Sequence, residues 1–374
     1  MYFKKIRLKD FRNFSDQTFK FSSGINFLVG ENGQGKSNLL EALTLFTQGE
    51  SFRYGDNSSL IKENAEESLV TTEVENLNLE YELKLSILKS RRHFLINEKK
   101  ISALDLKKKF NSVIFSPESL STIKESSDLR RHLVDDLLVS ISSQNAELIY
   151  DFRKALKTRN RILKDFVEKL QSQETTERLL ESLDPSYFRL AAELTKARIL
   201  ALKEIQSEFN NAMQYISKNK TVDISVEYLV SDENIMDFLP QKIIDSMQNR
   251  SEELRSAEMA SGGTLVGPHK HQILFLYGQK DSRFYCSQGQ QRAIILSFKM
   301  AQVVYHRRVH GEYPVLLLDD VLSELDSTKK EALILFLHEI KTQTFITTTD
   351  LTLPESFHVE QTAVISIRDG KIQE

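Results

Sequence analysis

A glycine-rich turn between an apolar strand and a helix is the feature that most constrains this chain. Residues 27–43 read FLVGENGQGKSNLLEAL, and Gly30 to Ser37 satisfy the pattern G-x-x-x-x-G-K-[ST]. Glycines let backbone N–H groups curl around a phosphate without Cβ clashes, and the following helix directs its positive end at the same anion. A chance glycine turn before a helix is the alternative, which the strand–turn–helix order disfavours. The pattern therefore predicts a phosphate-binding loop.

Such a loop needs partners for the phosphates and for a metal ion. In this pattern Lys36 reaches the β- and γ-phosphate oxygens, and Ser37 binds Mg²⁺. A second carboxylate is needed after a buried strand, and PVLLLDDVLSELD at 314–326 offers it. We expect Asp319 to hold the metal ion through water and Asp320 to orient or deprotonate the attacking water. A turn-capping role for either aspartate is the alternative, which is less favoured beside a phosphate loop.

The distance between these motifs along the chain excludes the compact classes of phosphate-loop protein. Asp319 lies 283 positions after Lys36 (319 − 36), which exceeds the whole length of a small GTPase-like or kinase-like domain. The nucleotide-binding domain is therefore expected to be split by a large insertion. The text NKTVD at 219–223 has the wrong spacing for the guanine-reading motif N-K-x-D.

Hydrophobic periodicity predicts how the rest of the chain is organised. From about 118 to 215 the period is helical. The polar stretch QSQETTE and the step at Asp184–Pro185 separate two runs, which predicts helical hairpins of modest length, too short for a long coiled-coil arm. Strands are expected where residues alternate or form short apolar runs, at 77–87, 222–230, 315–318 and 344–348, with a terminal hairpin around Asp369–Gly370. The fold class is α/β.

Composition excludes several other classes of protein. The 374 residues carry a net charge of −3, so global charge does not indicate nucleic acid binding. One cysteine, Cys286, excludes an internal disulfide framework and fits a reducing compartment. The N-terminus lacks the apolar segment of a signal peptide, and the apolar runs are too short to cross a bilayer. We expect a cytoplasmic protein without a membrane partner.

Any nucleic acid site must therefore come from local basic clusters. Each such cluster is more often a solvated helix face than a binding site, and Arg130 and Arg131 could instead pair with Asp135 or Glu125. No aromatic-interleaved basic surface indicates base stacking, so we expect phosphate contacts without sequence specificity. The candidate clusters are Arg91–Arg92, Lys107–Lys109, Arg130–Arg131 and the helix at 153–164.

A third motif shortly before the buried strand decides the class of nucleotide-binding protein. The text CSQGQQRAIILSFKMAQ at 286–302 places a Ser-x-Gly-Gln turn before an apolar helix. Lys36, then Ser287, Gly289 and Gln290, then Asp319 and Asp320 resemble, in this order, the heads of ABC/SMC-type ATPases. In that family the Ser-x-Gly-Gln loop acts in trans on the γ-phosphate held by the other subunit. The resemblance therefore implies that ATP joins two heads.

Over essentially its whole length the chain resembles the RecF family of bacterial recombinational DNA repair proteins. The shared segments, in order, are RLKDFRNF, GENGQGKSNLLEAL, FSPESL, LRRHLVDDLL, KTRNRILK, LVGPH, SQGQQR and LLLDDVLSELD. The resemblance implies an ABC/SMC-type head split between the two halves of the chain, at 1–115 and 259–374, with an inserted, mainly helical lobe at 116–258. It implies a weak, DNA-stimulated ATPase that uses ATP and Mg²⁺.

The resemblance also implies partners. An ATP-dependent homodimer would clamp double-stranded DNA at single-strand gaps and at single-strand/double-strand junctions. It would work with RecR and RecO to support RecA loading, and slow ATP hydrolysis would release the DNA. In RecF-like dimers the DNA lies over the joined heads and between the helical lobes. This favours contacts from the helix at 153–164, through Arg153, Lys154, Lys157 and Arg161.

Further roles carry over residue by residue. Arg12 and Asn13 match a pair that borders the nucleotide, and Arg53 matches an arginine near the phosphates. Asp326 matches the loop that crosses the dimer interface. Thr348 stands at the strand end where many ABC ATPases have a histidine. The phosphate loop and its flanks match at Gly30, Glu31, Asn32, Gly33, Gln34, Gly35, Lys36, Ser37 and Asn38.

Three departures from the family pattern stand out. Asp320 replaces the usual Glu of transporter and SMC heads, a feature that RecF-family proteins share, and its shorter side chain suggests slow turnover. The glutamine that coordinates Mg²⁺ in many ABC heads has no clear counterpart, and Ser116–Pro117 lies near its expected position. In GPHKHQ, His271 and Gln272 occupy positions where RecF-family sequences tend to carry two acids.

Two other classes remain open at this point. The first is the ATPase subunit of a membrane transporter, but such heads place the signature far closer to the phosphate loop than 251 positions (287 − 36). The second is an SMC-like structural or end-processing ATPase with a nuclease partner. The short helical insertion argues against the long arms of that class.

Overall fold

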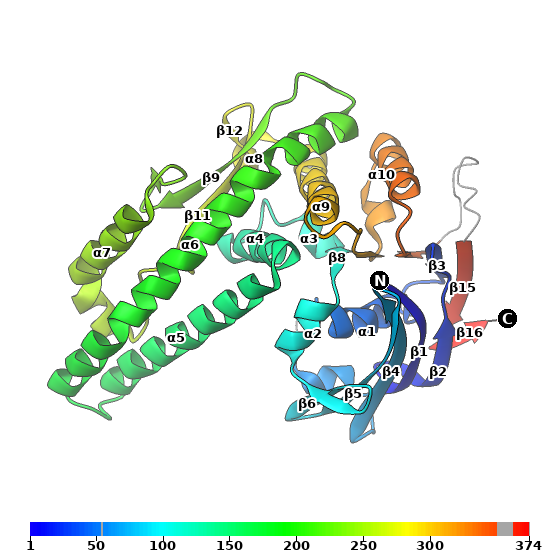
Figure 1. Cartoon of the computed structure of the whole chain (residues 1–374), viewed down its shortest axis with the longest axis horizontal. Coiled ribbons are helices and arrows are strands. Elements are labelled where there is room, and N and C mark those ends of the chain that lie inside the picture. The colour runs from blue at the N-terminus through cyan, green and yellow to red at the C-terminus, as the bar shows by residue number, and fades with distance from the viewer. Residues whose placement is uncertain (54, 350–361, 374) are drawn as a thin grey trace. The chain divides into compact units, whose positions relative to one another are not determined.

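The computed structural model describes residues 1–53, 55–349 and 362–373, and its chain forms two compact units (Figure 1). Unit 1 contains Met1–Ser121, Asn211–Lys220 and Gln288–Glu374, whereas unit 2 contains Thr122–Asn210 and Thr221–Ser287. The chain therefore leaves unit 1 and returns to it. The domain limits expected at 115/116 and 258/259 stay a prediction.

A mainly parallel sheet forms one layer of unit 1. Its strand order is β16-β15-β3-β14-β13-β8, and only β16 runs antiparallel to its neighbour. β13 is buried along its whole length, as expected for a strand covered on both faces. The strands β13 and β14 and the terminal hairpin lie where they were predicted. The bounds are β3 Ile25–Val29, β8 Ser112–Phe115, β13 Val315–Leu318, β14 Thr344–Thr348, β15 Thr362–Arg368 and β16 Lys371–Gln373.

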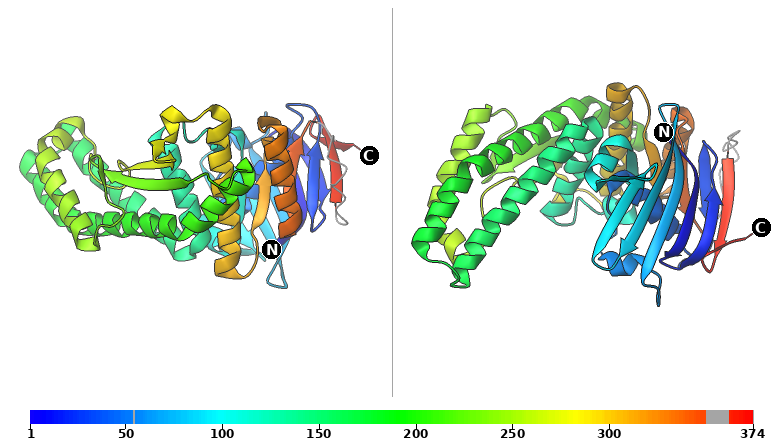
Figure 2. Two further views of the ribbon diagram at one scale, coloured as in Figure 1. Left: turned by 90° about the horizontal axis from the view of Figure 1, so that it is seen from above. Right: turned by 60° about the horizontal axis from the view of Figure 1, so that its bottom comes forward.

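An antiparallel sheet forms a second layer of unit 1, in the order β2-β1-β4-β5-β6-β7 (Figure 2). The alternation predicted at 77–87 appears in β5, where Leu83, Leu85 and Ile87 are fully buried, but Leu79 at its start is 58% exposed. The bounds are β1 Tyr2–Phe11, β2 Phe14–Lys20, β4 Glu67–Asn76, β5 Leu79–Leu88, β6 Arg91–Ile96 and β7 Lys99–Ile101.

Helix α1, Lys36–Gln48, packs into the core between these layers. Its Leu39, Leu43 and Phe46 are fully buried and share one hydrophobic cluster with side chains of both sheets. Burial on most sides fixes the direction of the helix, and thus fixes where its N-terminus points. The other helices of unit 1 are α2 Ala103–Lys109, α3 Pro117–Leu120, α9 Gln288–His310, α10 Ser327–Ile340 and the short η1 Asn57–Leu60 and η2 Val321–Glu324.

Unit 2 is mainly helical and contains a small sheet in the order β10-β9-β11-β12. Its strands are β9 Ile224–Val230, β10 Glu233–Asn234, β11 Gln272–Tyr277 and β12 Lys280–Asp281. Its helices are α4 Ser127–Ile141, α5 Ser143–Val167, α6 Gln173–Ser217, α7 Pro240–Ser261 and α8 Ser282–Tyr285, and the last residues of α6 belong to unit 1.

The predicted helix break at Asp184–Pro185 is wrong. Helix α6 contains Pro185 in its interior and is 45 residues long in total, or about 68 Å at 1.5 Å per residue. It is therefore longer than the helices of modest length that were expected. Proline removes one N–H and frees the carbonyl four residues earlier. Pro185 and Glu181 are both exposed, so water can satisfy that carbonyl. Within the described part of the chain, no helix is both long and apolar enough to cross a membrane.

Candidate nucleotide-binding site and nucleic-acid interface

The loop between β3 and α1 adopts the backbone that its glycines predict. Gly33 and Gly35 have φ of 81° and 117°, which is the left-handed region. A Cβ added to Gly35 would lie 2.8 Å from Asn13 Nδ2. Gly35 therefore allows both the turn and the close approach of β1's end to the loop.

The N-terminus of α1 is open to an anion. Among the described residues no side chain caps this helix, and its first turn carries no acidic residue. By contrast, Ser102, Ser116 and Asp326 cap α2, α3 and α10. Uncapped N–H groups and the helix dipole favour a bound anion at this end. The phosphate loop therefore has the local structure that its sequence predicts.

The Lys36 side chain folds into the loop. Its Nζ donates to the carbonyl oxygens of Gly30, at 2.5 Å, and Glu31, at 2.7 Å. Burial lowers the pKa of the Lys36 ammonium, while the nearby Asp320 and Asp319 carboxylates oppose this shift. The lysine and both aspartates thus lie within electrostatic reach of one another.

The carboxylate of Asp319 meets the hydroxyl of Ser37 at the carboxyl end of β13. Burial raises the pKa of Asp319, and hydrogen bonds from Ser37 and Thr347 together with the Arg53 charge oppose the rise. A serine hydroxyl and a carboxylate are oxygen ligands of the kind that Mg²⁺ takes together with phosphates and water. In the described part of the chain no group of three or more His, Cys, Asp or Glu could hold a metal ion. The donors therefore fit a metal that shares its ligands with a nucleotide.

Asp320 holds an uncommon backbone conformation beside this carboxylate. Its φ is 48° and its ψ is 24°, the left-handed region that costs a non-glycine residue free energy. Its backbone N–H donates to Thr347 Oγ1 at 2.7 Å, and this bond stabilises the turn. Thus the two aspartates predicted from the sequence lie at one edge of the sheet.

Thr347 is a site residue that the sequence interpretation missed. Its Oγ1 donates to Asp319 Oδ1 at 3.0 Å and accepts from the Asp320 N–H, and the side chain is fully buried. β14 lies between β3 and β13, so a hydroxyl near its end can reach the Asp319 strand. The threonine run 347–349 was the available signal, but the prediction named only Thr348. That residue's carbonyl accepts from Gly30 N at 3.3 Å.

A polar chain connects the loop to its predicted neighbours. Asn13 Nδ2 donates to Gln34 O at 3.0 Å, Asn38 Nδ2 donates to Asn13 Oδ1 at 2.9 Å, and Arg53 Nη1 donates to Asn38 Oδ1 at 3.0 Å. Arg53 Nη2 also lies 3.8 Å from Asp319 Oδ2. These residues therefore lie around the loop, and their contact with a nucleotide stays a prediction.

Arg12 has a structural partner that the sequence did not reveal. Its guanidinium makes two hydrogen bonds, of 2.9 and 2.7 Å, to the fully buried Glu41 of α1. The Arg12 side chain also lines an open pocket beside the loop. Its contact with a nucleotide stays a prediction. The pocket is lined by Arg12, Asn13, Asn38, Ser59, Ile61, Lys62 and Glu63.

The C-terminal hairpin supports the phosphate loop from another side. Gln34 Oε1 accepts from Asp369 N at 2.5 Å, and Gln34 O accepts from Gly370 N at 3.1 Å. Near the expected glutamine position, Ser116 caps α3, and the Glu118 charge acts on Asp319. Glu118 is thus an acidic neighbour of Asp319 that the sequence did not single out. Glu31 and Asn32 are exposed on the loop.

The Ser-x-Gly-Gln segment lies at the start of α9. Ser287 is exposed, and Gly289 and Gln290 belong to the first turn of the helix. Asp326 is the N-cap of α10, where its Oδ1 accepts from Lys329 N at 3.0 Å. The hydrogen bond and ion pair with Lys329 lower the pKa of Asp326. Its role across a dimer interface remains a prediction.

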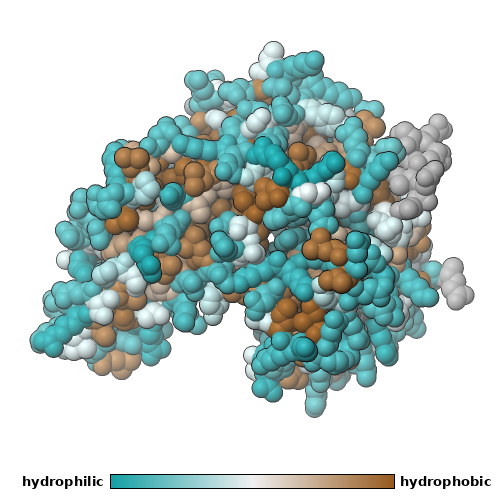
Figure 3. Space-filling model, viewed as in Figure 1, coloured by the Kyte–Doolittle hydropathy of each residue, from teal (hydrophilic) through white to brown (hydrophobic). Residues whose placement is uncertain are grey.

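A basic stripe runs along the exposed face of α5. Arg153, Lys157, Arg161 and Lys164 recur every three or four residues and are exposed, and Lys154 borders them. Arg161 Nε lies 2.7 Å from Asp165, but exposed pairs of this kind contribute little. The stripe ends at the C-terminal end of α5, where Val167 and, beyond the helix, Leu170 are exposed. Figure 3 shows a few hydrophobic side chains among hydrophilic ones on the surface of unit 2.

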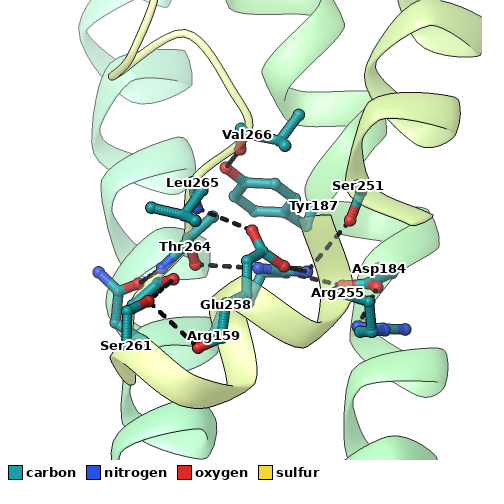
Figure 4. Close-up of polar contacts among 12 residues, drawn as sticks. Arg159, Asp184, Tyr187, Ser251, Arg255, Glu258, Ser261, Thr264, Leu265 and Val266 are labelled. Carbon is teal, nitrogen blue, oxygen red and sulfur yellow. Dashed lines mark hydrogen bonds and ion pairs between the residues drawn. The ribbon is translucent and has the colours of Figure 1, made fainter. Parts of the chain in front are cut away.

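Arg159 belongs to the opposite face of α5, so its inclusion in the basic cluster was wrong. It is fully buried, and Figure 4 shows it between α6, α7 and the strap at 262–269. Its Nε donates to Asp184 at 2.8 Å, and its Nη2 donates to Glu258 at 2.8 Å. Its Nη1 donates to Thr264 at 3.1 Å. Arg159 is a structural residue of unit 2.

The carboxylate pairing suggested for Arg130 and Arg131 is also wrong, because Arg130 reaches Glu125 only at its main-chain carbonyl oxygen, at 2.8 Å. Both are buried; Arg130 donates to carbonyl oxygens that include Ile273 O, at 2.9 Å, and Arg131 pairs with Asp128. Asp135 pairs instead with Arg198. Burial lowers the pKa of Arg130 to about 10, and the nearby Arg283 charge acts in the same direction.

His271 is buried where an acid was expected. Its Nδ1 lies 3.1 Å from the Tyr228 hydroxyl. Burial lowers the pKa of His271 well below its ordinary value, and the neighbouring Arg198 charge contributes. A neutral imidazole therefore replaces a charge at this position, and Gln272 begins β11.

Comparison with known proteins decides the family. The model of the RecF/RecN/SMC N terminal domain matches residues 2–373. A DNA replication and repair protein RecF from Lactobacillus johnsonii is 35% identical over 360 residues, which cover 94% of this chain and 93% of the relative. The chain belongs to the RecF family. The family resemblance in the motifs is thereby confirmed, and it does not support the alternative of a transporter subunit.

Solved structures confirm the fold of this RecF-family chain. The recombination mediator protein RecF-ATP in the RecFOR pathway matches with a TM-score of 0.85 and 31% identity, covering all of this chain and 98% of that one. An Smc head domain from Pyrococcus furiosus matches with a TM-score of 0.56 at 17% identity, which shows the fold alone. The predicted ABC/SMC-type head with a helical insertion is therefore correct.

Proposed function

We propose that this RecF-family chain is an ATP-switched DNA clamp of recombinational repair. The observation that carries the proposal is the convergence of the uncapped α1 N-terminus with Lys36, Ser37 and Asp319 at one sheet edge. Relatives named as DNA replication and repair proteins, and a relative described with ATP, support it. ATP binding joins two copies on DNA, and slow hydrolysis separates them.

Each residue at the sheet edge has a role that its geometry supports. Backbone N–H groups of 30–37 cradle the phosphates, and Lys36 neutralises the charge between the β- and γ-phosphates. Ser37 and Asp319 are the residues that would hold Mg²⁺, which neutralises phosphate charge when bound. Asp320 orients the attacking water and accepts its proton. The neighbours Asn13, Asn38 and Arg53 fix the loop through their hydrogen bonds.

The dimer and the DNA use surfaces outside that edge. Exposed Ser287 and the N-terminus of α9 contact the γ-phosphate held by the second copy. The basic stripe of α5 contacts phosphates of double-stranded DNA, including duplex next to single-strand gaps. RecR and RecO are the expected partners in supporting RecA, as the name RecFOR pathway of the solved relative suggests. DNA stimulation of hydrolysis is part of the proposal.

Fluorescence anisotropy of gapped duplex DNA tests this function. The wild type and Asp320→Asn are titrated with and without ATP and Mg²⁺. ATP is expected to tighten DNA binding by the wild type. In Asp320→Asn the tight binding is expected to last longer, because an amide cannot accept the proton of the attacking water and hydrolysis is slower. DNA binding that is the same with and without ATP in both proteins would refute the clamp.

Thr347→Val is expected to slow ATP hydrolysis by about 10- to 100-fold with little change in ATP affinity. Valine removes both hydrogen bonds of Oγ1, and bonds to charged groups contribute roughly 1.5–3 kcal/mol. Asp319 and Asp320 then lose their fixed geometry. Single-turnover hydrolysis and nucleotide titration measure the two effects. The matched control is Thr344→Val on the same strand, whose buried Oγ1 donates to Thr342 O at 3.1 Å. Equal rates in both variants would contradict the role of Thr347.

Removing the basic stripe is expected to lower the salt dependence of DNA binding. Each phosphate contact contributes about 0.9 to the slope of log K against log salt. Replacing Arg153, Lys154, Lys157 and Arg161 by glutamine therefore lowers the slope by up to about 3.6. The control is Lys196→Gln, an exposed lysine of α6. An unchanged slope in the fourfold variant would place the DNA elsewhere.

A further inference from the structure

An exposed aromatic pair lies directly before the Ser287 segment. On α8, Phe284 is 76% exposed and Tyr285 is 68% exposed, the highest values for aromatic side chains among the described residues. Adjacent rings left in water on a folded surface indicate a site of interaction. Nothing in the roles assigned above uses them.

The short turn that carries these rings is held firmly. Asp281 Oδ1 accepts from Arg283 N at 2.9 Å, and its carboxylate binds the Arg283 guanidinium at 2.9 and 2.6 Å. Ser282 is fully buried below them. The Arg283 guanidinium lies 5.1 Å from the first ring, and Lys280 Nζ lies 5.4 Å from the second. Side chains fixed before binding lose little conformational entropy on binding.

We propose that Phe284 and Tyr285 form an apolar anchor that docks on a second copy of this chain. The inference rests on the proposed function, because the ATP-joined dimer places Ser287 against the partner. The two rings precede that residue by three and two positions, so they reach the same interface. Aromatic and arginine side chains are enriched at the energetic centres of such interfaces.

The area available supports this occupant. A covered aromatic side chain buries roughly 150–250 Å², and about seven tenths of each ring is exposed here. Four rings in a symmetric dimer would bury roughly 400–700 Å², against about 1,600 Å² for a standard interface. The two rings thus supply a substantial part of the apolar area of the interface. Contacts to the nucleotide alone would not supply that area.

An unstacked nucleobase is the other occupant that exposed rings with nearby cations could take. Asp281 already balances the charge of Arg283, so residues 280–285 carry a net charge of only +1. Phosphate-rich strands favour a stronger positive surface. A neutralised, ordered Arg–Asp pair beside aromatic rings fits a protein surface better, so we assign the second copy.

Sedimentation velocity of the full chain tests the anchor. Three proteins are compared in the presence of ATPγS and Mg²⁺: the wild type, Phe284→Ala/Tyr285→Ala and Leu239→Ser. In a separate titration, a fluorescent ATP analogue measures nucleotide binding at dilute protein. Leu239 is the matched control because it is 75% exposed on the same unit. The double alanine variant is expected to raise the dimer dissociation constant at least about 30-fold, with nucleotide affinity unchanged. Phe284→Tyr/Tyr285→Phe, which retains the rings, is expected to dimerise normally.

The outcomes separate this inference from the function beneath it. A wild type that stays monomeric with nucleotide refutes the proposed clamp and the anchor together. Normal dimers of the double alanine variant refute the anchor alone. If that variant also loses binding of labelled oligo(dT), the rings are a nucleobase site instead. Equal loss of dimers in Leu239→Ser would likewise overturn the assignment, because the effect would not be specific to the rings.

Discussion

Lys36→Ala is expected to weaken ATP binding by about 10- to 150-fold and to abolish the gain in DNA affinity that ATP provides. The lysine ammonium lies within electrostatic reach of both Asp319 and Asp320, and the side chain is largely buried within the loop. Hydrogen bonds to charged groups contribute about 1.5–3 kcal/mol each. In the proposed clamp, bound nucleotide stabilises the dimer on DNA, so loss of ATP affinity would remove the switch by mass action. Equilibrium titration with a fluorescent ATP analogue and DNA anisotropy measure the two consequences.

The control for this variant is Lys20→Ala, which removes an exposed lysine from β2 of the same unit. It is expected to behave as the wild type. Circular dichroism checks that Lys36→Ala is folded, which is expected because the carbonyls of Gly30 and Glu31 can bond to water instead. ATP binding within twofold of the wild type would show that the loop holds phosphates without its lysine.

Glu258→Ala is expected to destabilise unit 2 by about 3–5 kcal/mol. Removing one partner of a buried ion pair leaves the other charge without compensation in a low dielectric. In this case Arg159 would keep Asp184, but Leu265 N would lose its acceptor, a bond of 2.7 Å to Glu258 Oε1. Figure 4 shows how these groups join α5, α7 and the strap. Urea denaturation and hydrogen exchange of the strap at 262–269 measure the loss.

Glu252→Ala is the matched control, since it removes an exposed glutamate from the same helix. Its expected effect lies within about 0.5 kcal/mol. A loss below about 1 kcal/mol in Glu258→Ala would mean that water reaches Arg159, and that the cluster is not a dry structural element. Two units are present, so the unfolding of each is followed separately.

The sequence predicted the parts of the site whose chemistry requires particular residue types in a fixed local order. Lys36, Ser37, Asp319 and Asp320 lie together because the phosphate loop and the buried strand each have a strong local signature. The terminal hairpin at Asp369–Gly370 is local in the same sense. Family membership confirms the split head that the spacing indicated.

Other parts depend on contacts between distant segments and left no local signal. Thr347 reaches Asp319 only because β14 lies between β3 and β13. Arg159 is basic like its neighbours in sequence. Only its place on the buried face of α5, where it bonds to Thr264, Ser251 and Glu258, reveals it as a core residue. Pro185 marked a helix end by propensity, but an exposed position lets tertiary packing override that preference.

The position of β3 has a consequence for synthesis of the chain. This apolar strand pairs on one side with β14, where Ile25 faces Thr344, and on the other side with β15, where Ile25 faces Thr362. A nascent chain emerging from the ribosome has neither neighbour until almost all of it has been translated, so β3 stays an uncovered strand edge through most of elongation. Fragments ended by a premature stop codon would keep that edge and would lack the hydrogen bonds that Thr348 and Gly370 make to the phosphate loop. A chain that lacks β14 and β15 therefore exposes both edges of an apolar strand, which favours aggregation and chaperone binding.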